Sequence, residues 1–246
     1  MIDAYVINLE RQIENYSKVE NAMIDLGGFN VHRVSAVDGK KGEHLPLVDS
    51  ETTWICNKTC PDSIIAIALS HKKTAHMIRE SGVDYALILE DDAFPIKDNF
   101  HEKLQRTLAK VPDDWDIINL FCQGGCPTNS INTTYTTGST AAILVSSRGA
   151  KKIIDLKINN HIDVQTNFSL NKYKSFDNLF EVDETDSTNR SNSYTPSARL
   201  KQPLLPDPRA TQYNYFKLFG FTWIVDDFLN FKIYFILFVI IWFFKL

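Results

Sequence analysis

Apolar and polar positions along the first two thirds of the chain form blocks that predict strands and helices in turn. Residues 4–9 are apolar on both faces and predict a short buried strand. Apolar residues at helical spacing follow until a Gly-Gly stop at 27–28, and residues 29–37 predict a second strand. Residues 85–89 are a continuous apolar run, which is typical of a strand buried on both sides.

The later segments continue this alternation. Residues 40–60 are polar and irregular, and a helix is then predicted to begin with Asp62 or Ser63 as its cap and to end at Gly82. The remaining expected elements are a helix around 100–111, strands at 116–121 and 140–145, and a helix from a Ser146 cap to Lys157. Alternating strands and helices predict an α/β fold with a mostly parallel sheet.

The C-terminal third has a different character. Residues 183–214 are rich in Ser, Thr, Asn and Pro without any period, which predicts a long loop. Residues 233–244 are an unbroken apolar run, and with their flanks they give 19 residues, about the length of a bilayer span. A buried terminal helix is the alternative, but a helix that is apolar on every side favours a membrane anchor. The expected organisation is an α/β domain at 1–182, a polar loop and connecting region at 183–227 and a hydrophobic segment at 228–246.

Composition and charge narrow the class of protein. The 246 residues are 44% hydrophobic and 23% charged, which is ordinary for a globular chain. A net charge of −4 argues against a nucleic-acid partner. The first residues hold no basic region and no long apolar run, so no signal peptide is predicted. The cysteines come as Cys56-x3-Cys60 and Cys122-x3-Cys126, a spacing that favours loop-stapling disulfides or free thiols over zinc.

The strongest chemical signal is Glu90-Asp91-Asp92, directly after the apolar run at 85–89. Ligands of open α/β sheets bind at the carboxyl ends of strands. Three adjacent carboxylates repel one another, and a divalent cation relieves that repulsion. Mn²⁺ or Mg²⁺ takes one or two carboxylates and completes its shell with water and phosphate oxygens, which suits a nucleotide diphosphate. The alternative is an acidic turn that only faces solvent.

Six short segments resemble glycosyltransferase family 25, whose members include bacterial lipooligosaccharide galactosyltransferases and procollagen galactosyltransferases. They occur in the family's order over residues 5–155. The six are Tyr5-Val6-Ile7-Asn8-Leu9-Glu10-Arg11, Ala36-Val37-Asp38-Gly39, Ala68-Leu69-Ser70-His71, Leu87-Ile88-Leu89-Glu90-Asp91-Asp92, Trp115-Asp116-Ile117-Ile118-Asn119-Leu120 and Ser147-Arg148-Gly149-Ala150-Lys151-Lys152.

The resemblance implies a GT-A-like nucleotide-sugar-binding fold and an inverting transfer of galactose or glucose from a UDP-sugar. The acceptor would be a glycan, a lipid-linked glycan or a protein hydroxyl, as in lipopolysaccharide biosynthesis. Without a signal peptide, a membrane-anchored enzyme of this kind would be membrane-associated with its catalytic domain facing the cytosol.

The resemblance also assigns roles to residues. Asp92, and then Glu90, would bind the metal, since side chains two apart on a strand point the same way while Asp91 turns aside. The donor-binding candidates are Asn8, Arg11, Asp38, Ser70, His71 and Asp91. Arg11 could fork to a phosphate or be a solvated arginine, and Asp38 could hold a ribose hydroxyl or only shape its turn. His71 is either a donor-pocket residue or a core histidine.

An inverting transfer also needs a base for the acceptor hydroxyl. Asp163 is the candidate, and His161 is a possible metal ligand or alternative base, because His161-Ile162-Asp163 replaces the family's later proline-aspartate motif. The chain also lacks the family's usual Gly-Cys before Ala68, having Ile65-Ala66-Ile67 there. These departures leave a non-catalytic glycan-binding or adhesion protein as the alternative function. A nucleotidyltransferase is a weaker alternative, since no Gly-rich phosphate loop is visible.

Overall fold

A central sheet organises the computed structural model, which describes residues 1–121, 139–183, 215–218 and 221–224. In these residues the sheet has six strands in the order β2-β1-β3-β6-β5-β7. The strands of this sheet are β1 (Ile2–Asn8), β2 (Phe29–Ser35), β3 (Tyr85–Glu90), β5 (Ile117–Asn119), β6 (Ala142–Ser146) and β7 (Lys172–Lys174). Only β6 runs antiparallel to its neighbours among these strands. The expected α/β fold with a mostly parallel sheet is confirmed.

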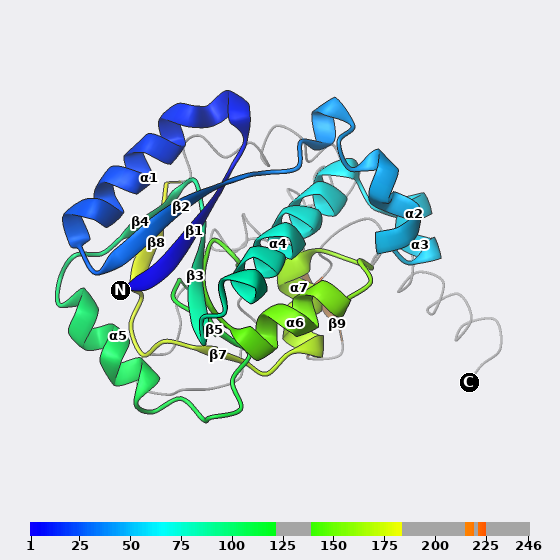
Figure 1. Ribbon diagram of the computed structural model, residues 1–246. Coiled ribbons are helices and arrows are strands. Elements are labelled where there is room, and N and C mark those ends of the chain that lie inside the picture. Colours follow the sequence, from blue (N-terminus) through cyan, green and yellow to red (C-terminus); the bar gives the residue numbers. More distant parts are fainter. Residues whose placement is uncertain (122–138, 184–214, 219–220, 225–246) are drawn as a thin grey trace. The chain divides into compact units, whose positions relative to one another are not determined.

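Helices cover both faces of this sheet (Figure 1). The longer helices are α1 (Ile13–Leu26), α4 (Asp62–Ser81), α5 (Phe100–Leu108), α6 (Ser147–Asp155) and α7 (Ile162–Ser169). Side chains of α1 and α5 share one buried cluster with Leu87 and Leu89 of β3. Side chains of α4 and α6 share a second cluster with Ala86 and Ile88. Strand β3 is therefore buried on both faces, as its continuous apolar run predicted.

Several element ends follow from local chemistry. Gly27 and Gly82 both have φ of +73° after their helices, a conformation that glycine adopts without a Cβ penalty. Ser146 caps α6 by accepting a hydrogen bond from the Gly149 amide at 3.0 Å. The expected cap of α4 is wrong, because Pro61 occupies the N-cap position and Asp62 already lies in the helix. Proline fits there since the first helical turn has amides without intrahelical partners.

Short elements in polar sequence were not predicted. Between β2 and α4 lie the 3-10 turns η2 (Gly39–Lys41) and η3 (Leu45–Leu47) and the helices α2 (Val48–Glu51) and α3 (Trp54–Thr59). A 3-10 turn, η1 (Glu10–Gln12), precedes α1, and an antiparallel pair joins β4 (Ala93–Pro95) to β8 (Phe180–Val182). Their apolar patterns are too short to show a period, so packing rather than sequence pattern defines them.

The chain separates into two units, residues 1–57 with 61–187 and residues 58–60 with 188–246. In the second unit, β9 (Tyr215–Leu218) and β10 (Phe221–Ile224) pair antiparallel, within a region expected to be a connecting loop. The domain boundary expected at 182 stays a prediction. The apolar segment 228–246 lies outside the described residues, and so does most of the polar segment 183–214. Among the helices that are described, none has the length and apolarity to cross a bilayer.

A buried carboxylate joins β5, β6, α6 and the chain before β7. Asp116 is fully buried and accepts hydrogen bonds from the Arg148 Nε at 2.9 Å, the Asn171 amide at 2.8 Å and the Lys152 ammonium. Its carbonyl accepts from the Ser146 amide at 3.0 Å. Two of the six family-like segments therefore meet here in a structural clamp, with Arg148 and Lys152 as the counter-ions of Asp116.

Gly149→Ala should destabilise this clamp. A Cβ at residue 149 would clash with the Asp116 carbonyl oxygen, so α6 would have to move away from β5. We expect a loss of about 1–3 kcal/mol in the free energy of unfolding, measured by urea denaturation. Lys151→Ala, on the exposed side of the same helix, is the control and should change it by less than about 0.5 kcal/mol. Equal effects of the two substitutions would contradict the close packing.

Asp116→Asn should give a stability loss that depends on pH. Burial would raise the pKa of Asp116, but hydrogen bonds from Lys152, Asn171 and Arg148 outweigh it and lower that pKa. A lowered folded-state pKa contributes stability that is present above the unfolded value of about 3.9 and is lost as the pH falls through the folded value.

The free energy of unfolding of the wild type should exceed that of Asp116→Asn by roughly 2–4 kcal/mol between about pH 5 and 7. The gap should narrow below about pH 4. Asp155→Asn, in an exposed pair with Lys151, is the control for a surface carboxylate. A gap that stays constant to pH 3 or widens in acid would contradict a clamp made by the ionised form.

Candidate active site

Polar side chains gather where β1 and β3 end, at the same edge of the sheet. Ile7 of β1 lies beside Glu90 of β3, so Asn8 and Asp91 follow at neighbouring positions. Thr140, just before the antiparallel β6, donates its hydroxyl to Glu90 Oε1 at 3.2 Å. Ligand-binding residues were expected at the carboxyl ends of the strands, and this edge brings together Asn8, Glu90 and Asp91.

The acidic triplet is partly buried, and its charges interact. Burial raises the pKa of Asp92 to about 8, and the charges of Glu90, Asp91 and Asp183 add to that rise. Burial also raises the pKa of Asp91 to about 6, against a hydrogen bond from Asn8 that lowers it. The Oδ1 atom of Asp92 is buried and makes no hydrogen bond among the described residues. The side chains of Asp91 and Asp92 are therefore partly withdrawn from water, which disfavours an acidic turn that only faces solvent.

Strand β3 ends at Glu90, and Asp91 and Asp92 form a turn. The alternation of side chains that predicted convergence of Glu90 and Asp92 therefore ends two residues before Asp92 and does not apply to it. Asp183, which the sequence analysis did not consider, reaches the same place because its amide donates to the Asp92 carbonyl at 2.9 Å. This pairing extends the β4–β8 ladder, a tertiary contact for which the sequence carries no signal.

His71 lies on α4 and faces the triplet. It is 1% exposed, and its Nε2 is 3.7 Å from Glu90 Oε1. Neither ring nitrogen makes a hydrogen bond among the described residues. A core histidine normally satisfies its ring nitrogens, so this position suits a group that bonds to something bound at the edge of the sheet.

Asn8 connects the two central strands to a cation. Its amide donates to Asp91 Oδ2 at 2.6 Å and to the Gln12 carbonyl at 2.8 Å. Its carbonyl oxygen accepts from Arg33 Nε at 3.0 Å and from an Arg33 terminal nitrogen at 2.8 Å. Asn8 is 1% exposed, so it positions Asp91 and Arg33 from inside the protein. Arg33 was not predicted, because it sits in a strand pattern without any motif.

Arg11, Asp38 and Ser70 are brought to the segment that follows β2. Arg11 forms an ion pair with the buried Asp38, whose carboxylate also accepts from the Lys40 amide at 2.9 Å. Ser70 accepts from the Val37 amide at 2.9 Å and donates to the Ala66 carbonyl at 2.8 Å. Asp38 does shape its turn, and Ser70 fastens α4 to it, so both act structurally whatever ligand is bound.

The proposed base lies in a separate cluster at the start of α7. His161 Nδ1 and Asp163 Oδ1 are 2.9 Å apart. Burial would raise the pKa of Asp163, but the charge and hydrogen bond of His161 and the charge of Lys172 lower it overall. Lys172 is 2% exposed, and burial lowers its pKa to about 8 despite the attraction of Asp163. Lys172 was not predicted, since a lysine in a short strand reads as a surface residue.

Among the described residues, sets of three or more protein side chains that could bind a metal are not found. In residues 1–121 and 139–183, no three His, Cys, Asp or Glu side chains are arranged to hold a metal ion. Cys56 and Cys60 are each disulfide-bonded, which agrees with disulfides rather than free thiols or zinc at these two cysteines. Cys122 and Cys126 lie outside the described residues.

Asn8→Ala should destabilise the edge of the sheet. Asp91 would lose an amide donor and Arg33 would lose its acceptor, both in a partly buried setting. We expect a loss of about 2–3 kcal/mol in the free energy of unfolding, measured by urea denaturation. Asn30→Ala is the matched control, because the Asn30 amide makes an exposed 3.3 Å bond to Asp3 and should contribute under about 0.5 kcal/mol. A loss no larger than that of the control would show that Asn8 does not hold the edge together.

Comparison with solved structures finds glycosyltransferases of low similarity. A glycosyltransferase involved in glycosylation of the major capsid of PBCV-1 is 12% identical, with a TM-score of 0.35 and 62% of each chain covered. Galactosyltransferase LgtC, in complex with donor and acceptor sugar analogs, is 10% identical, with a TM-score of 0.38 and coverage of 70% of this chain and 73% of its own.

GlyE of Streptococcus pneumoniae TIGR4 is 8% identical with a TM-score of 0.38, and the match covers 70% of this chain and 44% of GlyE. The chain thus spans less than two thirds of the capsid glycosyltransferase and of GlyE. A search of curated protein sequences finds no match.

The sequence profile of glycosyltransferase family 25, described as an LPS biosynthesis protein family, matches residues 1–134. This span is more than half of the chain and contains Asn8, Arg11, His71 and the acidic triplet. The mostly parallel sheet agrees with the GT-A type of fold that the resemblance implied. The chain belongs to glycosyltransferase family 25.

Proposed function

We propose that the protein transfers galactose or glucose from a UDP-sugar, with inversion and with the help of a divalent metal, to a hydroxyl of a glycan, a lipid-linked glycan or a protein. The observation that carries this proposal is the partly buried acidic triplet at the end of β3, with the buried Oδ1 atom of Asp92, in a chain of this family. The description of the family as LPS biosynthesis proteins supports a glycan or lipid-linked glycan as the acceptor.

A divalent cation fits the residues at this edge. Asp92 has a buried oxygen without a hydrogen bond among the described residues, and Glu90 and Asp91 surround it with negative charge. Mg²⁺ and Mn²⁺ need only one or two protein carboxylates when a diphosphate supplies other oxygens. A set of fewer than three protein ligands is therefore sufficient. Asp92 and Glu90 would hold the ion, which would act as a Lewis acid on the leaving diphosphate.

The remaining residues at this edge would orient the donor. Arg33 and Arg11 each keep guanidinium donors beyond the bonds already described, and a planar guanidinium matches phosphate geometry. His71 would donate to or accept from the bound nucleotide sugar through a ring nitrogen. Asn8 would keep Asp91 and Arg33 in position while negative charge develops on the leaving diphosphate of the donor.

The acceptor hydroxyl needs a base, and we propose that His161 and Asp163 act as a pair. Asp163 alone is a weak base, because its pKa is lowered. In the pair, the carboxylate fixes the orientation and tautomer of the imidazole and stabilises it once protonated, as in other His-Asp pairs. His161 would then take the proton.

The experiment is release of UDP from a panel of UDP-sugars, with Mn²⁺ and with EDTA. We expect release with UDP-galactose or UDP-glucose only when the metal is present. Asp92→Asn should lower that release by about 100-fold or more, since even substitution of residues behind metal ligands costs 10–100-fold.

Asp155→Asn, a carboxylate in an exposed pair with Lys151, is the control and should keep full activity. Release that EDTA leaves unchanged would contradict the metal. If no donor releases UDP, and if Asp92→Asn binds the UDP-sugars as the wild type does, the non-catalytic glycan-binding alternative would be favoured.

A further inference from the structure

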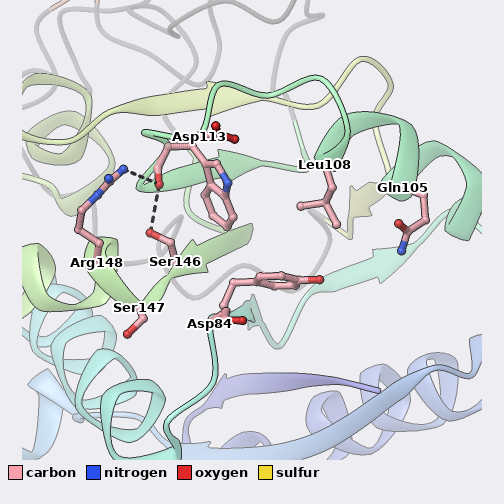
Figure 2. A pocket seen from close by; sticks show the side chains of 9 residues that line it. Asp84, Gln105, Leu108, Asp113, Ser146, Ser147 and Arg148 are labelled. Atoms are coloured by element: carbon pink, nitrogen blue, oxygen red, sulfur yellow. Dashed lines mark hydrogen bonds between the residues drawn. The ribbon is translucent and has the colours of Figure 1, made fainter.

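An open pocket of about 470 Å³ lies at the amino end of β3, at the other end of the strand from the acidic triplet (Figure 2). Asp84 and Tyr85 line the pocket, whereas the triplet begins at Glu90. Tyr85 and Glu90 are five positions apart along the strand, roughly 17 Å at about 3.3 Å per residue. The pocket is therefore separate from the site described above, and none of the roles proposed so far uses it.

An aromatic pair forms part of the pocket wall. The rings of Tyr85 and Trp115 have centroids 6.0 Å apart and planes tilted by 56°. Both side chains pack partly against the core, which limits their movement. The Trp115 carbonyl accepts hydrogen bonds from Arg148 and Ser146, each at 3.1 Å, and its amide donates to the Pro112 carbonyl at 3.1 Å. These hydrogen bonds fix the backbone of Trp115, and the packing against the core holds the two rings in place.

Polar groups surround this aromatic wall. In Figure 2, Gln105 lies on the side opposite Arg148, and Asp113 and Asp84 lie on opposite edges between them. The side chains of Asp84, Gln105 and Asp113 are exposed and make no hydrogen bond to another residue in the described part of the chain. They can accept from, and Gln105 can also donate to, a ligand with several hydroxyl groups.

The charges of the pocket select against an anion. Two carboxylates, Asp84 and Asp113, are at its rim. Arg148 also lines the pocket, but it is one positive charge against two carboxylates, and it pairs with the buried Asp116 at 2.9 Å. A phosphate or a nucleotide would therefore meet net negative charge, whereas a neutral polyhydroxyl ligand would not. Apolar contact area with a few well-placed polar groups is the usual composition of a small-molecule site.

We infer that this pocket binds one neutral hexose unit of a glycan, with the sugar ring against Trp115 and Tyr85 and its hydroxyls on Asp113, Asp84 and Gln105. Aromatic side chains supply a large apolar face, and carboxylates form strong hydrogen bonds with hydroxyl donors. A glycan held here while another part of the same molecule reaches the reaction centre would bind at a raised effective concentration. This inference does not depend on the metal or on the identity of the donor.

The test is NMR titration of the ¹⁵N-labelled full chain, reading the indole N–H signal of Trp115, which is assigned from its loss in Trp115→Phe. Lactose and maltotriose are the sugar probes, and choline chloride and UDP are the charged probes. We expect lactose or maltotriose to shift the Trp115 signal with a millimolar Kd, as for a single small contact area.

Asp113→Asn and Gln105→Ala should each weaken sugar binding by about five- to tenfold, since each removes one hydrogen-bonding group. Glu102→Gln, on the same helix as Gln105 but outside the pocket, is the matched control and should not change it. These variants alter exposed side chains, so they should fold, and they test the pocket without any change at Trp115.

Asp92→Asn separates this inference from the proposed function. The variant should lose UDP release but keep the sugar-induced shift of Trp115. The inference would be overturned by no shift with either sugar up to about 50 mM, well above a millimolar Kd. It would also be overturned by a shift that only choline or UDP produces, or by one that disappears in Asp92→Asn.

Discussion

Burial of β3 on both of its faces is the constraint on which the rest of the structure depends. Its side chains alternate between two clusters, one under α1 and α5 and one under α4 and α6. A strand enclosed in this way can carry polar groups only at its ends. The carboxylates that follow Glu90 are therefore held at one edge of the sheet, partly out of water, and their pKa values rise because of it. The same constraint leaves Asp84 and Tyr85 at the opposite edge.

Around this strand, the buried polar groups divide into those that hold the fold and those that face the acidic edge. Asp116 belongs to the first kind, since Arg148, Lys152 and Asn171 satisfy it completely. Asp92 and His71 belong to the second, since each keeps a buried atom without a hydrogen bond among the described residues. Buried polar atoms without partners cost free energy, so their presence at one edge of the sheet agrees with a site that a ligand completes.

Segments that are equally prominent in the family resemblance have different roles in the structure. The segments with Trp115-Asp116 and with Ser147 to Lys152 stand out in sequence as much as the acidic triplet does. The structure shows that they meet in a clamp, where Gly149 leaves room for the Asp116 carbonyl. A segment can therefore be characteristic of a family because it closes the fold, without contacting a substrate.

The sequence by itself determined the order of the long elements, because apolar periodicity and glycine stops are local properties of the chain. It located β1, α1, β2, α4, β3 and the acidic triplet, and it identified the family. Only the tertiary structure decided which polar residues meet. Arg33, Asp183 and Lys172 joined the candidate site through contacts between elements distant in sequence, which no local pattern encodes. Packing also decided where β3 ends, at Glu90. It placed the pocket and the triplet at opposite ends of that strand, because the neighbours that bury a strand decide which of its residues remain accessible.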